Sequence, residues 1–171
     1  MKKFSLLILL LISSFGFGFA FRAMMENKTE DVKAFKKVTG IGGIFFKCKD
    51  PGKLKEWYKN NLGLQTDKYG TNFVWYQGAD STKKGYTQWS PFVESTKYFG
   101  SEKQDFMINY RVDNLEALIR EFKQTGVVMV DTMESYNYGK FIHILDNEGN
   151  KVELWEPVDE EYGKFEGGQT K

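Results

Sequence analysis

The last third of the chain brings one histidine and one glutamate into a position where they could share chemistry. His143 is the only histidine in the sequence, and Glu153 follows it in a predicted hairpin over residues 141–156. If Leu145 pairs with Lys151 across the turn, His143 pairs with Glu153, and such cross-strand partners share a face with Cβ atoms roughly 5 Å apart. A histidine beside a carboxylate can act as an acid–base pair or supply two ligands to one divalent metal ion. We therefore predict His143 and Glu153 as candidate catalytic residues and as candidate metal ligands.

Two other interpretations of this pair stay open. His143 and Glu153 can face solvent as a modest ion pair. A slip of the hairpin by one residue would instead turn the two side chains to opposite faces of the sheet. Either arrangement would leave no shared site.

Aromatic residues on predicted strands are candidates for lining a ligand cavity. Aromatic residues make up 16% of the chain, which fits either an apolar cavity or an aromatic-rich core. Phe141 and Trp155 share the face of His143 and Glu153, because side chains alternate along a strand. The predicted ligand-binding residues are Trp75, Gln88, Trp89, Tyr110, Phe141 and Trp155. Arg111 could bind a substrate anion from its strand, although a surface position is the expectation for an arginine.

Composition and motifs exclude several classes of chemistry. The net charge of +1, with lysines mixed among acidic residues, gives no footprint for nucleic acid, so we expect no such partner. The sequence has no phosphate-binding loop, dinucleotide fingerprint or Ser/His/Asp set. Cys48 is the single cysteine, so it forms no intramolecular disulfide, and no histidine lies beside it in the sequence to activate a catalytic thiol.

The hydrophobic pattern predicts strands separated by turn-rich segments. The predicted strands cover residues 39–47, 72–76, 86–90, 106–112, 127–130, 141–145 and 151–156. Residues 77–85 are typical of a polar turn, and residues 91–104 form a longer connection.

Two predicted helices begin and end at matching positions. Asp50 caps the first helix and Gly63 ends it, while Asp113 and Asn114 cap the second and Gly126 ends it. Aligning Asp50 with Asp113 carries Gly63 onto Gly126 without a gap. This spacing fits a domain made of two similar halves. Mixed strands with one helix in each half predict the α+β class.

Three motifs resemble the vicinal-oxygen-chelate superfamily, which includes glyoxalases, bleomycin-resistance proteins and dioxygenases. The motifs are KDPGKLKEWYKNNLGL at residues 49–64, VDNLEALIREFKQTGV at residues 112–127 and ILDNEGNKVELWEP at residues 144–157. They resemble the helix and its exit in the first half, the same element in the second half, and the closing hairpin of that family. The resemblance covers residues 40–157. It implies two βαβββ modules that form a curved mixed-sheet cup.

The resemblance also implies where a metal ion would bind. In metal-dependent members of the family, ligands come from the first strand of each module and from the last strand. Counting back from the aligned helix starts gives Gly43 and Phe106, neither of which can be a ligand, and the neighbouring Met107 offers only a thioether. Glu153 matches the strand glutamate of the family. The usual set of metal ligands is therefore incomplete.

These observations predict a small-molecule binding protein with an aromatic-lined cup and without the full metal-ligand set. The alternative is a metal-dependent, glyoxalase-like lyase or isomerase, or a dioxygenase, that holds one divalent ion through Glu153 and His143, with Gln88 as a weaker partner. A second alternative is a non-enzymatic component of the cell envelope. The resemblance also allows a homodimer.

The N-terminus reads as an export or anchor segment. Lys2 and Lys3 precede an uncharged run from Phe4 to Phe21, and small residues near its end are typical of a signal-peptidase site. The run is at the short limit for a membrane span, so an uncleaved anchor competes with a cleaved signal peptide. We expect an exported protein, periplasmic or membrane-anchored, unless Met24 or Met25 is the true start, which would make it cytoplasmic.

The predicted organisation combines these segments in order. It comprises a leader over residues 1–23, a linker over residues 24–38, the domain over residues 39–158 with modules at 39–92 and 105–157, and a flexible tail over residues 159–171.

Overall fold

The computed structural model describes residues 37–100, 103–165 and 167–170. The predicted leader lies outside these residues, as does the predicted linker up to residue 36. Within the described ranges, no helix has the length and apolar character needed to cross a membrane.

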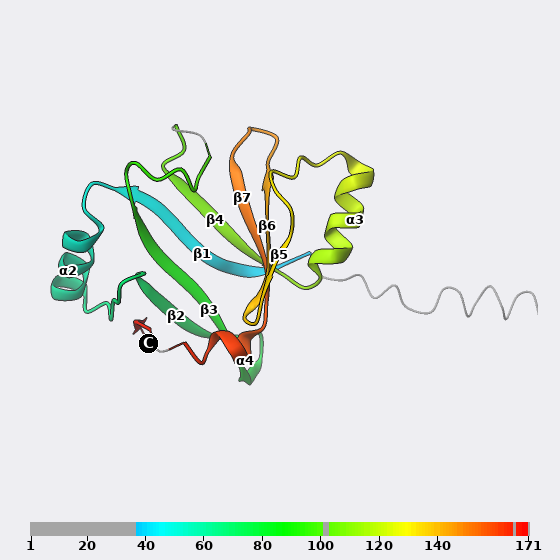
Figure 1. Ribbon diagram of the computed structural model, residues 1–171. Helices are drawn as coiled ribbons and strands as arrows, with labels where there is room; N and C mark the ends of the chain where they lie inside the picture. The colour runs from blue at the N-terminus through cyan, green and yellow to red at the C-terminus, as the bar shows by residue number, and fades with distance from the viewer. Residues whose placement is uncertain (1–36, 101–102, 166, 171) are drawn as a thin grey trace, which may run out of the picture. The chain divides into compact units, whose positions relative to one another are not determined.

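One mixed sheet holds the strands of the described residues together (Figure 1). In chain order the elements are β1 (Val38–Cys48), α2 (Pro51–Leu62), β2 (Thr71–Gln77), β3 (Asp80–Val93), β4 (Phe106–Val112), α3 (Leu115–Thr125), β5 (Glu134–Tyr136), β6 (Gly139–Leu145), β7 (Lys151–Pro157), α4 (Asp159–Tyr162) and β8 (Gln169–Thr170). Across the sheet the order is β5-β6-β7-β4-β1-β3-β2-β8. This curved mixed sheet with helices confirms the predicted α+β class.

The two halves meet at the centre of the sheet, where β1 and β4 pair antiparallel. Within each half the first strand pairs in parallel with the last, β1 with β3 and β4 with β7. Figure 1 shows β1 and β4 side by side, with α2 and α3 at opposite ends of the sheet. The second half has four strands of its own. In the first half, the outer edge of β2 is completed by β8 from the end of the chain.

The helix caps lie where the sequence predicts them, except that the N-cap of α3 is one residue later than the position aligned with Asp50. The Asp50 side chain accepts from the backbone N–H of Lys53, and Asn114, rather than Asp113, accepts from Ala117 in the same way. Gly63 and Gly126 both take positive φ, 73° and 78°, at the helix ends. Asp50 therefore corresponds to Asn114.

This correction moves one predicted metal position. Counting back from Asn114 instead of Asp113 makes Met107 the counterpart of Gly43, in place of Phe106. A thioether thus stands where the sequence alignment placed a phenyl ring.

Several segments differ from the predicted pattern. β3 begins at Asp80 and continues through Pro91, so most of the predicted turn and the start of the predicted connection are strand. It is long because it pairs with β1 on one side and β2 on the other. The predicted strand at residues 127–130 forms only an isolated bridge between Met129 and Ile144.

The register across the sheet aligns one row of side chains on a single face. Five paired residues make this row from β3 to β6: Gln88, Gly43, Asn109, Glu153 and His143. Paired residues point to the same side of a sheet, and we call this side the inner face. The outer face carries the alternate residues, and the helices α2 and α3 lie against it.

The end of the chain folds back over the inner face. We call residues 158–165 and 167–170 the C-terminal strap. The Tyr162 hydroxyl in α4 donates to Gln88 Oε1 at 2.7 Å, and its ring lies 4.8 Å from that of Trp155. These residues belong to the segment that the sequence predicts as a flexible tail. The structure instead gives them a short helix, whose Tyr162 ring packs on the sheet, and a two-residue strand that pairs with β2.

Candidate functional site

The predicted pairing of His143 with Glu153 is confirmed by the register of β6 and β7. His143 Nε2 lies 3.4 Å from Glu153 Oε2, which is ion-pair distance but outside hydrogen-bonding geometry. On its other side, His143 Nδ1 donates to Asp131 Oδ2 at 2.6 Å. Asp131 Oδ1 also accepts the backbone N–H of His143 at 2.8 Å, so one carboxylate fixes both the strand and the ring. The imidazole thus lies between two carboxylates.

Glu153 is almost fully buried and both of its oxygens accept hydrogen bonds. The Tyr98 hydroxyl donates to Oε2 at 2.6 Å, and Asn109 Nδ2 donates to Oε1 at 2.8 Å. The Tyr98 ring also meets the His143 ring edge-on at 5.4 Å. Burial and then the charge of Glu153 raise the pKa of Tyr98, so its hydroxyl stays protonated and able to donate. The chain itself therefore satisfies this buried carboxylate.

The same surroundings set the protonation of His143. Burial is the largest influence and lowers its pKa, but the contact and charge of Glu153, with the hydrogen bond of Asp131, outweigh burial. The positive charge of Lys151 is the smallest of these influences and lowers the pKa of His143. The pKa of His143 is therefore raised above its ordinary value of 6.5.

We expect the proton resonances of His143, the only imidazole in the chain, to titrate above pH 6.5. Because the folded state favours protonated His143, the resulting stabilisation is present below pH 6.5 and is lost as the pH rises through the folded pKa. Urea unfolding should show a midpoint that falls across this window, and a His143→Gln variant should lose that fall. A histidine titrating below 6.5 would contradict the assignment.

A second cluster surrounds Arg111, for which we predict a surface position from the sequence. That expectation is wrong, because the Arg111 side chain is only 3% exposed. Its Nη2 donates to Asp159 Oδ2 at 2.6 Å, and the guanidinium lies 5.4 Å from the ring of Trp75 and 5.2 Å from that of Trp155. Gly42 makes room for the cluster, since a Cβ there would lie 2.8 Å from Trp155 and 3.1 Å from Arg111.

The predicted ligand-binding residues separate into two groups. Gln88 and Trp155 lie on the inner face, Phe141 stacks on Trp155 at 5.8 Å, and Trp75 reaches the Arg111 cluster. Trp89 and Tyr110 alternate with inner-face residues and so point to the outer face, where Trp89 packs 4.8 Å from Tyr58 of α2. The last two do not join the site.

Several buried polar atoms at this site have no hydrogen-bond partner within the described part of the chain. They are Asn109 Oδ1, Arg111 Nε and Nη1, His143 Nε2 and Asp159 Oδ1. All belong to the two clusters just described. Buried polar atoms in folded proteins are nearly always paired, so the site has unused hydrogen-bonding capacity.

The side chains present do not fit a divalent metal centre. Gly43 has no donor, Met107 offers a thioether, and Gln88 Oε1 already accepts from Tyr162. Both Glu153 oxygens are engaged, and the described ranges contain no group of three histidine, cysteine or acidic residues arranged to hold an ion. The donor set is that of a polar network, not of a metal site.

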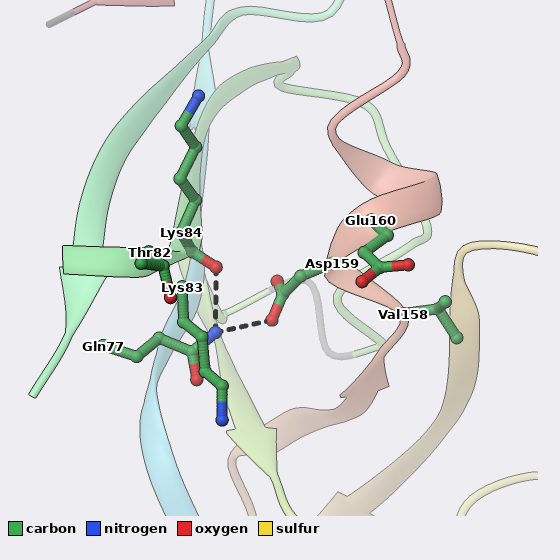
Figure 2. A pocket seen from close by; sticks show the side chains of 7 residues that line it. All are labelled: Gln77, Thr82, Lys83, Lys84, Val158, Asp159 and Glu160. Atoms are coloured by element: carbon green, nitrogen blue, oxygen red, sulfur yellow. Dashed lines mark hydrogen bonds between the residues drawn. The ribbon is translucent and has the colours of Figure 1, made fainter. Parts of the chain in front are cut away.

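A surface hollow opens beside Asp159 (Figure 2). Its volume is ≈ 480 Å³, and it is lined by Gln77, Thr82, Lys83, Lys84, Val158, Asp159 and Glu160. Figure 2 shows the Asp159 carboxylate pointing from α4 towards Gln77, whose Nε2 donates to Asp159 Oδ2 at 2.7 Å. Asp159 thus lies between this hollow and the buried Arg111.

No protein-family model and no curated protein sequence matches the chain. Among solved structures, it is similar to methylmalonyl-CoA epimerase from Mycobacterium tuberculosis, with 18% identity, a TM-score of 0.52, and coverage of 75% of this chain and 94% of that one. A Streptomyces coelicolor methylmalonyl-CoA epimerase in complex with 2-nitronate-propionyl-CoA matches with 13% identity, a TM-score of 0.53, and coverage of 71% and 99%. At such identity the likeness establishes the fold alone. The chain therefore has the fold of the methylmalonyl-CoA epimerases.

Proposed function

We propose that this chain binds an organic small molecule on the inner face of its sheet, without a catalytic metal ion. The observation that carries the proposal is the set of unpartnered buried atoms on Asn109, Arg111 and His143. Leaving a buried donor or acceptor unpaired costs about 1–3 kcal/mol each, so several at one site indicate that something else pairs with them.

The character of the site supports an organic ligand. Flat rings line it beside a few polar groups, which is typical of small-molecule sites. Two of the similar epimerase structures are complexes with coenzyme A derivatives, one with methylmalonyl-CoA and one with 2-nitronate-propionyl-CoA. Those ligands belong to the epimerases, and for this chain they support only the general class of partner.

The metal-dependent alternative has a direct test. After incubation of the full chain with Mn, Fe, Ni or Zn and removal of the free ion, we expect elemental analysis to find far less than one ion per chain. A near-stoichiometric ion that disappears in a Glu153→Ala variant would overturn the metal-free proposal.

Ligand binding has its own test. We expect 2-naphthoate or its neutral match 2-naphthamide to quench tryptophan fluorescence saturably in the presence of a chelator. A Trp155→Phe variant should weaken this binding, whereas Trp89→Phe, on the outer face, should leave it unchanged. Absence of saturable binding by both compounds would sink the proposal.

A second candidate function is metal-free proton transfer, which the arrangement around His143 favours. Asp131 fixes one imidazole nitrogen, and the other faces Glu153, as in an acid–base relay. The expected signature is exchange with D₂O of the acidic C–H protons next to the carbonyl of an added aryl ketone, followed by NMR and abolished in His143→Gln.

A further inference from the structure

We propose that the C-terminal strap is an internal competitor for the ligand, and that the ligand is a flat aromatic molecule carrying a carboxylate. In the closed state Asp159 occupies the position of that carboxylate at Arg111. The ligand binds when the strap moves away. This inference rests on the proposed function and names the ligand class and the gate of the same site.

The contact between Arg111 and Asp159 uses only part of what each group offers. Guanidinium and carboxylate groups commonly pair through two parallel hydrogen bonds. Here only Nη2 donates to Oδ2, while Arg111 Nε and Nη1 and Asp159 Oδ1 lie buried without a partner in the described residues. A carboxylate on a mobile ligand, free of the backbone of α4, can turn to form both bonds.

The strap also presents an aromatic ring beside its carboxylate. Three residues after Asp159, the Tyr162 ring packs 4.8 Å from Trp155, which also stacks on the nearly parallel ring of Phe141. The Tyr162 hydroxyl lies 2.7 Å from Gln88 Oε1, to which it donates, and 2.9 Å from Asn72 Oδ1, both on the sheet. The strap therefore places a ring and an anion where an aromatic carboxylate would place its own. This pairing of features is the reason for the proposed ligand class.

The strap is attached to the sheet by few backbone contacts. β8 pairs with β2 over two residues only, and the Asn72 N–H donates to Gly168 O at 2.8 Å. The Thr170 hydroxyl lies 2.9 Å from that of Thr71. The hollow in Figure 2 opens to solvent next to Asp159. Release of the strap would therefore expose Arg111 and leave the hydrogen-bonded pairs among the other strands, from β1 through β7, intact.

The first test compares Asp159→Asn with Glu160→Gln, which removes the same charge from the exposed neighbouring residue. Asp159→Asn keeps the size of the side chain but removes the competing anion. We expect it to tighten binding of 2-naphthoate about tenfold and to change binding of 2-naphthamide little, while Glu160→Gln behaves as the parent for both. Equal affinity of Asp159→Asn and parent for 2-naphthoate would overturn the inference.

The second test closes the strap reversibly and remains informative if Asp159→Asn folds poorly. Cysteines in place of Thr71 and Thr170, in a Cys48→Ser background, would join β8 to β2 by a disulfide when oxidised. We expect oxidation to abolish 2-naphthoate binding and dithiothreitol to restore it. Unchanged binding in the oxidised chain would refute the gate.

The failures of the two proposals are distinguishable. Suppose that 2-naphthamide binds the parent, but that neither Asp159→Asn nor oxidation of the double-cysteine variant changes the binding of 2-naphthoate. The inner face then binds ligands, and only the inference about the strap fails. If neither compound binds parent, Asp159→Asn or reduced chain, the proposed function fails with it.

Discussion

Replacing Glu153 with glutamine is expected to lower the pKa of His143 below its ordinary value and to reduce the free energy of unfolding by about 2–3 kcal/mol. Burial is the largest influence on His143 and acts downwards, and the contact and charge of Glu153 are the next largest and act upwards. Without that charge, the hydrogen bond from Asp131 alone does not balance burial. Stability falls because the amide offers one neutral acceptor oxygen in place of two charged ones, so either Tyr98 or Asn109 then faces an NH₂ group that cannot accept. NMR titration of the single histidine and urea unfolding measure the two effects.

The matched control is Glu148→Gln, which changes the same charge at an exposed position in the turn between β6 and β7. It should leave both the histidine titration and the unfolding midpoint as in the parent. A histidine that still titrates above 6.5 in Glu153→Gln would show that Asp131 alone raises its pKa and that the charge of Glu153 is not required.

The His143–Glu153 pair was accessible from the sequence because its geometry is local. Turn-forming residues fix the hairpin, and alternation along each strand then places the two side chains opposite each other. Asn109 lies in the same row but two strands further into the sheet from His143, beside Glu153. Finding it requires the parallel pairing of β4 with β7, which no short-range pattern specifies.

Asp131 and Tyr98 could not be found in the same way. Both lie in connections, one between α3 and β5 and the other between β3 and β4, and each reaches the site by tertiary folding. Sequence patterning describes how a strand presents its side chains, but it does not say which loop returns over which face.

The strap shows where composition misleads. The tail is acidic and rich in glycine, which favours a flexible end, yet Tyr162 and Phe165 are spaced for one side of a helical turn. Their rings pack against each other at 5.9 Å and against Tyr138 of the sheet region. That spacing was the available signal. Burial of Arg111 depends on this segment. Because the sequence predicted a flexible tail, it also predicted an arginine at the surface.

The contact between Arg111 and Asp159 leads to the second large effect, on stability. Asp159→Ala leaves a buried guanidinium without its anion, and we expect it to lower the free energy of unfolding by about 3 kcal/mol, the low end of the range because Asp159 is 23% exposed. Arg111→Met should cost a similar amount, because Asp159 then lacks its main donor. The double variant, Arg111→Met with Asp159→Ala, should cost much less than the two single changes together, since it buries no unpaired charge.

Urea unfolding of the four proteins in this cycle measures the coupling, and a second pair on the same strap supplies its control. Lys164 and Glu161 form an ion pair that is largely exposed, with side-chain exposures of 68% and 37%. Exposed pairs contribute little because solvent screens them, so changes at these two residues should simply add. Additive costs at Arg111 and Asp159 as well would mean that the strap is held by Tyr162 and its neighbours alone. Strong coupling at the buried pair would instead show that the carboxylate of Asp159 is what the guanidinium requires, and this is the requirement that a ligand carboxylate would meet.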